Sequence, residues 1–285
     1  MNYLLLFLTA LFIVFQKITQ TRYNRTCSSG VFLFSGMISF CAMLFFMAVN
    51  RDWHFSSVLL IPAVGFGLSY AAATVFIVLA IKNGSLAKTT LITSYSLLVP
   101  AFAGLIVLHE PIGVPMLVGM VLLVVSLWLT NYQKGNEEEK LSLKWLICVV
   151  IGFVGNGMCS TVQKLTPHYI PAEELNQNLY MILALALSGT VLVAASFLTG
   201  ETDLKATVRH GSWLAALCGL FNGAVNYLAI YLNQFIPASV MFPVLSAGEI
   251  ILIFPYSLLI CHEKFSKKQW AGFAIGVVSV ILLNL

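Results

Sequence analysis

Residues 113–132 read GVPMLVGMVLLVVSLWLTNY, a stretch of twenty positions without a charged side chain. An α-helix needs about 20 mostly apolar residues to cross the hydrocarbon core of a bilayer. Similar apolar runs follow one another along the chain, separated by short polar breaks. We expect ten membrane-spanning helices, at residues 3–20, 29–49, 57–81, 85–108, 113–132, 143–164, 176–199, 211–232, 237–261 and 267–285.

The composition of the whole chain predicts the same class of protein. Of its 285 residues, 59% are hydrophobic and 9% are charged, whereas soluble domains carry about 25% charged residues. Ten spans use about 200 residues and leave no room for a soluble catalytic domain. We therefore expect an all-α, polytopic protein of the plasma membrane, with the lipid bilayer as its solvent. The net charge of +4 indicates no nucleic-acid partner.

The second half of the chain repeats the first at a shift of 153 residues. Residues 85–132 align with residues 238–285 without a gap. The matched positions are His109-Glu110 with His262-Glu263, Gly119 with Gly272, and Val124-Val125-Ser126 with Val277-Val278-Ser279. The opening helices match as well, since Gln16-Lys17 falls on Gln163-Lys164.

This duplication predicts how the chain is organised. We expect two five-helix repeats, residues 1–132 and 143–285, joined by a polar linker at residues 133–142. Because five is odd, the second copy enters the membrane upside down. Inverted repeats of this kind underlie many secondary transporters, whose substrate sites lie near the bilayer midplane.

In this arrangement of two five-helix repeats, the chain resembles the drug/metabolite transporter superfamily, in its ten-helix EamA-type branch. The resemblance rests on the duplicated short-looped helices, on a lysine closing the first helix of each repeat (Lys17, Lys164), and on a glutamate just after the fourth (Glu110, Glu263). It implies a carrier whose cavity is lined mainly by the first, third and fourth helices of each repeat. Members are associated with amino acids, amines, sugars, nucleotide sugars and drugs, and analogy alone favours export.

Glu249 is the charge that the predicted helices explain least. It lies twelve residues from both Pro237 and Cys261, roughly 18 Å of helix from either end. A carboxylate at this depth costs at least ~2.5–3.5 kcal/mol and must face a partner or a wet cavity. Burial favours its neutral form, so we predict that Glu249 exchanges protons as its access to water alternates. Permanent binding to a neighbouring polar group is the alternative.

All other charged residues are expected in loops or near helix ends. Lys17, Lys88 and Lys164 then extend their ammonium groups to an interface. Thirteen of the fifteen Lys and Arg residues fall at odd-numbered loops, and only Arg51 and Lys164 fall at even ones. The positive-inside rule then predicts cytoplasmic odd loops and both termini outside, whereas the resemblance favours termini inside.

Amide side chains lie at the depth of Glu249. Asn222 and Asn226 share one helix face, and Asn156 stands between Gly155 and Gly157, where two backbones can approach closely. Polar side chains also hold membrane helices together, so a packing role is the alternative. The first repeat offers hydroxyl and aromatic groups at the same level, with Ser96 as the counterpart of Glu249. The predicted cavity residues are Glu249, Asn156, Asn222, Asn226, Tyr70, Thr74, Tyr95 and Ser96.

These features favour a carrier, coupled to protons, for a small cationic or zwitterionic metabolite such as an amino acid, amine or drug. A passive channel or a lipid-handling protein is the alternative. An exchanger of anionic sugars or nucleotide sugars needs Arg or Lys deep in the cavity, which the predicted helices lack. Deep histidine or aspartate is also lacking, which disfavours an intramembrane enzyme. The six cysteines have no metal-binding spacing, so we expect neither metal nor cofactor. The oligomeric state stays open.

Overall fold

The computed structural model describes residues 2–27, 30–108, 113–131, 142–201, 204–262 and 266–283. Within these ranges the chain is helical, with turns between the helices and no strands. The elements are α1 (Asn2–Thr26), α2 (Val31–Val49), η1 (Ser57–Leu59), α3 (Leu60–Asn83), α4 (Leu86–Ser94), η2 (Tyr95–Leu97), α5 (Leu98–Val107), α6 (Val114–Asn131), α7 (Leu143–Tyr169), α8 (Gln177–Leu198), α9 (Leu204–Leu232), α10 (Ala238–Leu259) and α11 (Lys267–Leu283).

These elements form ten helical rods, as the sequence predicted. The 3₁₀ turn η1 leads directly into α3, and η2 joins α4 to α5 within one rod. Among the described residues, seven segments are long and apolar enough to cross a membrane, and Leu117–Ser126 and Val244–Leu259 are shorter apolar stretches. The chain is therefore a polytopic helical membrane protein. Glu110, Glu263 and all but the last residue of the predicted linker at 133–142 lie outside the described residues.

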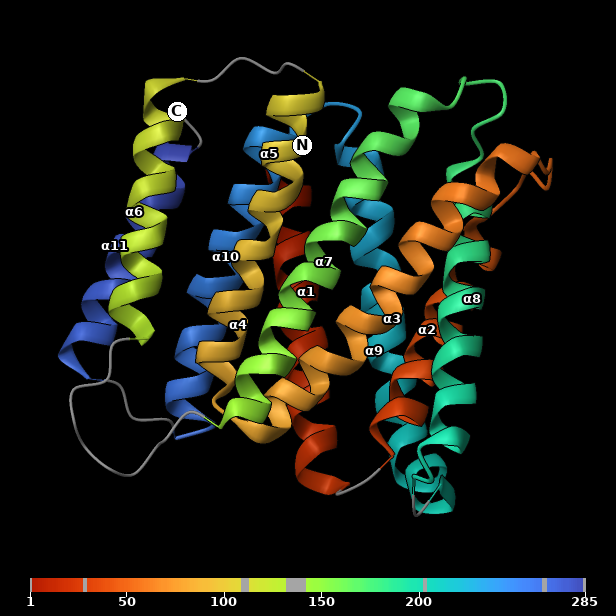
Figure 1. Ribbon diagram of the computed structural model, residues 1–285, viewed down its shortest axis with the longest axis horizontal. Helices are drawn as coiled ribbons and strands as arrows, with labels where there is room; N and C mark the ends of the chain where they lie inside the picture. Colours follow the sequence, from red (N-terminus) through yellow and green to blue (C-terminus); the bar gives the residue numbers. More distant parts are fainter. Residues whose placement is uncertain are drawn as a thin grey trace.

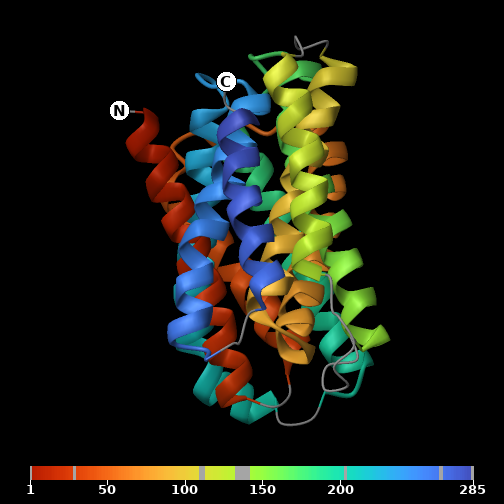
Figure 2. The same cartoon turned by 90° about the vertical axis from the view of Figure 1, so that its left-hand side faces the viewer.

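Successive rods run up and down, so Asn2 and Leu283 lie at the same end of the bundle (Figures 1 and 2). We call this the terminal end; the turn between α3 and α4 lies at the opposite end. Figure 1 shows α1 running away from the terminal end and α7 running toward it. These opposite directions are those expected of an inverted second copy. The orientation of the bundle in the membrane stays a prediction.

Three predicted boundaries are wrong, because residues taken as loops continue the helices. α1 runs to Thr26 rather than residue 20, α7 runs to Tyr169 rather than residue 164, and α9 begins at Leu204 rather than residue 211. The added turns pack against neighbouring helices. Tyr23 stacks on Phe34 with ring centroids 3.6 Å apart, and the Arg22 guanidinium lies 5.2 Å from the Trp213 ring centroid. Tertiary contacts of this kind extend a helix beyond the limits that local polarity predicts.

Helices α6 and α11 are joined by two matching hydrogen bonds. Ser126 Oγ donates to the Gly272 carbonyl at 2.6 Å, and Ser279 Oγ donates to the Gly119 carbonyl at 2.7 Å. The two serines, and likewise the two glycines, are counterparts in the sequence repeat. Reciprocal contacts of this kind are expected when two copies meet across an approximate two-fold axis. They support our proposal of two five-helix repeats.

Helices α3 and α7 approach each other closely at Gly155, as the sequence suggested. A Cβ atom on Gly155 would lie 2.9 Å from both the Ala73 nitrogen and the Ser69 carbonyl oxygen. These are backbone atoms, so neither can move aside cheaply. Gly65 on α3 is a matched control, because a Cβ there would meet Val162 Cγ2 at an ordinary 3.7 Å.

We therefore expect Gly155→Ala to lower the stability of the protein by about 1–3 kcal/mol through overpacking. Gly65→Ala gains the same helix propensity without the clash and should leave the stability equal or higher. Thermal unfolding midpoints of the two variants in detergent measure the difference. Equal midpoints would show that α3 and α7 do not meet as described.

Candidate functional site

Glu249 lies in the interior of α10 and is only 3% exposed. Its partner is Lys17, whose Nζ lies 2.8 Å from Glu249 Oε1. The expectation that Lys17 reaches an interface is therefore wrong. Lys17 stands nine residues before the end of α1 at Thr26, and its side chain is 9% exposed. The carboxylate is not a lone charge, because a basic side chain neutralises it at the same depth.

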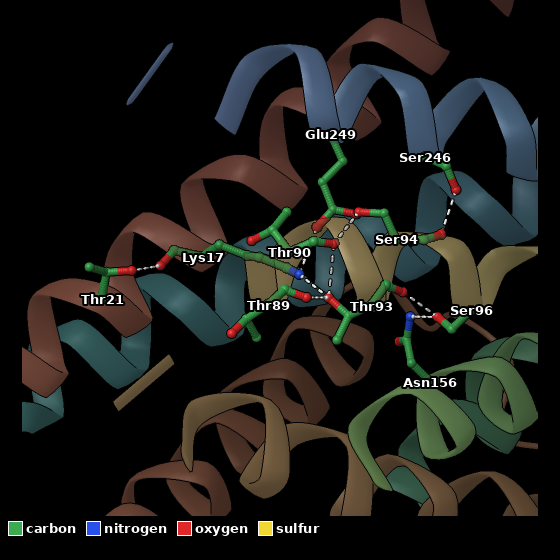
Figure 3. Close-up of polar contacts among 10 residues, drawn as sticks. All are labelled: Lys17, Thr21, Thr89, Thr90, Thr93, Ser94, Ser96, Asn156, Ser246 and Glu249. Carbon is green, nitrogen blue, oxygen red and sulfur yellow. Dashed lines mark hydrogen bonds and ion pairs between the residues drawn. The ribbon is translucent and has the colours of Figure 1, made fainter. Parts of the chain in front are cut away.

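Hydroxyl groups of α4 position both members of the pair (Figure 3). Lys17 Nζ donates to Thr93 Oγ1 at 2.7 Å, and Ser94 Oγ donates to Glu249 Oε2 at 2.7 Å. Ser246, one turn before Glu249, donates to the Ser94 carbonyl at 2.6 Å. The three helices α1, α4 and α10 are thus tied together at one point.

The chain changes from α-helix to 3₁₀ turn directly after Ser94. Pro100 explains this local geometry, because it has no N–H for the Ser96 carbonyl and its ring clashes with that carbonyl. A 3₁₀ segment inside a helix is often found at functional positions. Here the irregular turn lies beside the buried ion pair.

One carboxylate oxygen has unused capacity. Glu249 Oε1 accepts no hydrogen bond from the described residues, although Lys17 Nζ lies 2.8 Å away. At this distance the contact is a close ion pair, and it leaves further lone pairs of Oε1 unused. Lone pairs on Oε1 are therefore open to a proton or to a donor on a solute, because an ionised carboxyl accepts several hydrogen bonds.

A cavity of about 130 Å³ adjoins the pair and is lined by α1, α3, α7, α9 and α10. We call it the central cavity. Six of the eight predicted cavity residues line it: Glu249, Asn156, Asn222, Asn226, Tyr70 and Thr74. Asn226 Nδ2 donates to Asn222 Oδ1 at 3.1 Å, so these two amides share one face as expected.

Tyr95 and Ser96 do not line the central cavity. Tyr95 OH hydrogen-bonds Ser126 Oγ at 3.0 Å and so faces α6. Ser96 Oγ accepts from Asn156 Nδ2 at 2.7 Å, so it holds a cavity residue in place from behind. Both residues lie in the 3₁₀ turn η2, where the chain departs from a regular α-helix.

Sequence reasoning missed several polar residues of the cavity. Gln16, Lys17 and Gln20 on α1 and Gln163 on α7 all line it. The prediction that the first helix ends at residue 20 placed Lys17 beside an interface and concealed its depth. Their spacing was nevertheless informative, because polar residues three or four positions apart in an apolar helix share one face.

Removing one partner of a buried ion pair leaves the other charge uncompensated, which costs about 3–5 kcal/mol. We therefore expect Lys17→Met and Glu249→Gln each to lower thermal stability strongly, and the double variant to recover part of the loss. Unfolding midpoints of the full double-mutant cycle in detergent measure the coupling. Lys144→Met, at an exposed position of α7, is the control. Purely additive losses would contradict the pairing.

Comparisons with known proteins agree with this architecture. A family model described as EamA-like transporter family matches residues 143–285. A solved structure titled "Crystal structure of protein" has a TM-score of 0.69 and 11% sequence identity, and the match covers 100% of this chain and 98% of that chain. At this identity the likeness shows the fold alone. No curated protein matches the chain.

Proposed function

The chain belongs to the EamA-like transporter family, and on this premise we propose that it exports a small zwitterionic or cationic metabolite, such as an amino acid or an amine, in exchange for protons. Family membership identifies it as a multi-pass membrane transporter of the drug/metabolite type. The substrate and the coupling are our proposal. The observation that carries them is the buried pair of Lys17 and Glu249 beside the central cavity.

The charge balance of the site favours a zwitterion. A solute ammonium can approach Glu249 Oε1, which accepts no hydrogen bond from the described residues. A solute carboxylate can approach Lys17 Nζ, whose three donors include one directed at Thr93. A zwitterion therefore compensates both buried charges. A simple cation compensates Glu249 alone and leaves Lys17 to the surrounding hydroxyl and amide groups.

The buried lysine Lys17 also bears on the alternative function, an exchanger of anionic solutes. An exchanger of anionic sugars or nucleotide sugars needs a basic group inside the cavity, and Lys17 supplies one, contrary to the sequence expectation. Binding an anion to Lys17 leaves Glu249 without its cation, however, and this is costly unless the carboxyl is protonated. The 130 Å³ of the central cavity is also smaller than the 300–1,000 Å³ of typical ligand pockets, which favours a small solute.

Proton coupling follows from competition for one carboxylate. A proton on Glu249 removes the negative charge that attracts Lys17 or a solute ammonium. The proton and the ammonium therefore exclude each other at this oxygen. If each occupied form can turn to the opposite side of the membrane, solute leaves as protons enter. This exchange needs no further charged residue.

We expect Glu249→Gln to abolish accumulation driven by a pH gradient, because the amide cannot take up the proton. The measurement uses proteoliposomes with an imposed pH gradient. Its labelled solute is first identified by a thermal-stabilisation screen of amino acids, amines and nucleosides. Glu174→Gln changes an exposed carboxylate outside the cavity and should leave accumulation intact.

Retained uphill transport in the Glu249→Gln variant would refute the coupling role. Exchange of labelled for unlabelled solute without a gradient separates a carrier from a channel, because a carrier saturates and shows counterflow. Stabilisation of the protein by sugar phosphates alone would favour the anion exchanger.

Asn222 and Asn226 offer amide groups to the same solute. We expect Asn222→Ala and Asn226→Ala to weaken solute binding about 2- to 10-fold each, the effect of losing one hydrogen bond of about 0.5–1.5 kcal/mol. Leu220→Ala on the same helix changes a half-exposed side chain (49%) and is the control. Equal dissociation constants for all three variants would assign the two asparagines to helix packing.

A further inference from the structure

We propose that solute passes between the central cavity and the terminal end through a polar constriction formed by Gln163, Tyr180 and Asn233, which selects for polar solutes. The inference rests on the transport role of the chain but not on the coupling role of Glu249. It assigns a function to Tyr180 and Asn233, which do not line the central cavity, and to Gln163, which lines both the central cavity and the constriction. Three observations support it.

Polar residues follow one face of α7 from the central cavity toward the terminal end. Asn156, Ser160, Gln163 and Thr166 are spaced by four, three and three residues, which places them on one side of a helix. This stripe is about 15 Å long. Figure 1 shows α7 and α9 running toward the terminal end, and Asn233 stands in the turn directly after α9, beyond Asn222 and Asn226.

Three cavities follow one another along these helices. The central cavity shares Gln163 with a small cavity of about 10 Å³. The small cavity shares Gln177 and Ile230 with an open vestibule of about 860 Å³, formed by the end of α2, the start of α8 and the end of α9. A space of 10 Å³ holds about one water molecule, so the small cavity is the narrow part of the route.

Buried polar atoms without partners gather at this constriction. Among the described residues, Gln163 Nε2, Tyr180 OH and Asn233 Oδ1 make no hydrogen bond. Tyr180 OH lies beside the Thr166 side chain. Pro167 also lines the small cavity, and it has no N–H to offer the Gln163 carbonyl. A buried polar group without a partner costs free energy unless water or a ligand forms the missing hydrogen bond. The constriction therefore favours the passage of polar solutes.

The opposite side of the central cavity combines apolar packing with Gln20, whose Oε1 has no hydrogen-bond partner among the described residues. Val14, Ile77, Ile81, Leu86 and Ile253 are buried against one another there, and Ile77 also lines the central cavity. Opening a route on that side requires separating apolar contacts between helices. On the terminal side, the polar side chains of the constriction stand beside apolar neighbours such as Ile230.

A thiol placed in the central cavity tests the route. Val225 lines this cavity without belonging to the polar stripe, so Val225→Cys gives a reporter. The probe is 2-aminoethyl methanethiosulfonate, a small cationic reagent, applied to the purified full chain in detergent, where it reaches both ends. Mass spectrometry of the residue 225 peptide gives the modification rate and separates it from the native cysteines.

We expect Gln163→Leu combined with Asn233→Leu to lower this rate at least tenfold, because two apolar side chains then fill the constriction. Gln234→Leu alters the neighbouring amide, which borders the vestibule but not the small cavity, and should leave the rate within twofold. An unchanged rate in the double leucine variant would overturn the proposal, since the reagent would then enter elsewhere.

Tyr180→Phe keeps the ring packing and removes only the hydroxyl group. It replaces the double leucine variant as the test of the route if that variant fails to fold. It should lower the rate at least threefold, and an unchanged rate would again overturn the proposal. The modification rate of residue 225 measures the route, whereas accumulation driven by a pH gradient measures the coupling role of Glu249. Failure of the route and failure of the coupling are therefore distinguishable.

Discussion

The buried pair of Lys17 and Glu249 is the constraint on which the site depends. Neither charge is tolerated alone in a low-dielectric interior, so α1 and α10 must meet at one depth. The Thr93 and Ser94 hydroxyls complete the arrangement by binding one member each. Because Glu249 Oε1 accepts no hydrogen bond from the described residues, the pair is held without being saturated. A site of this kind can exchange its internal partner for a solute or a proton.

Different residues surround the central cavity toward the terminal end and toward the opposite end of the bundle. Toward the terminal end, amide and hydroxyl groups surround a narrow space and lack partners. Toward the other end, branched aliphatic side chains pack together beside Gln20, whose Oε1 also lacks a hydrogen-bond partner among the described residues. Polar groups can release one another for water at little net cost, whereas apolar contacts must be replaced by others. The narrow polar space at the terminal end is therefore the part of the cavity wall that we propose as the route for solute.

The sequence predicted the site in part. Asn156, Asn222, Asn226 and Glu249 line one cavity because polar groups in lipid-embedded helices turn toward the protein interior. Gly155 marked the close approach of α3 and α7. Lys17 was misplaced because the polar residues 22–25 suggested a loop, whereas Tyr23 stacking on Phe34 keeps them helical. Ring stacking between two helices cannot be predicted from the residue pattern of either helix alone.

The sequence by itself determined the class of protein, the ten rods and the presence of one deep carboxylate. It did so because lipid cannot satisfy backbone polar groups, so that every span must be a long apolar helix. Only the tertiary structure decided which cation faces Glu249 and which way Tyr95 and Ser96 point. Those outcomes depend on how far each helix extends and how it rotates about its axis, and both are set by contacts with helices distant in sequence.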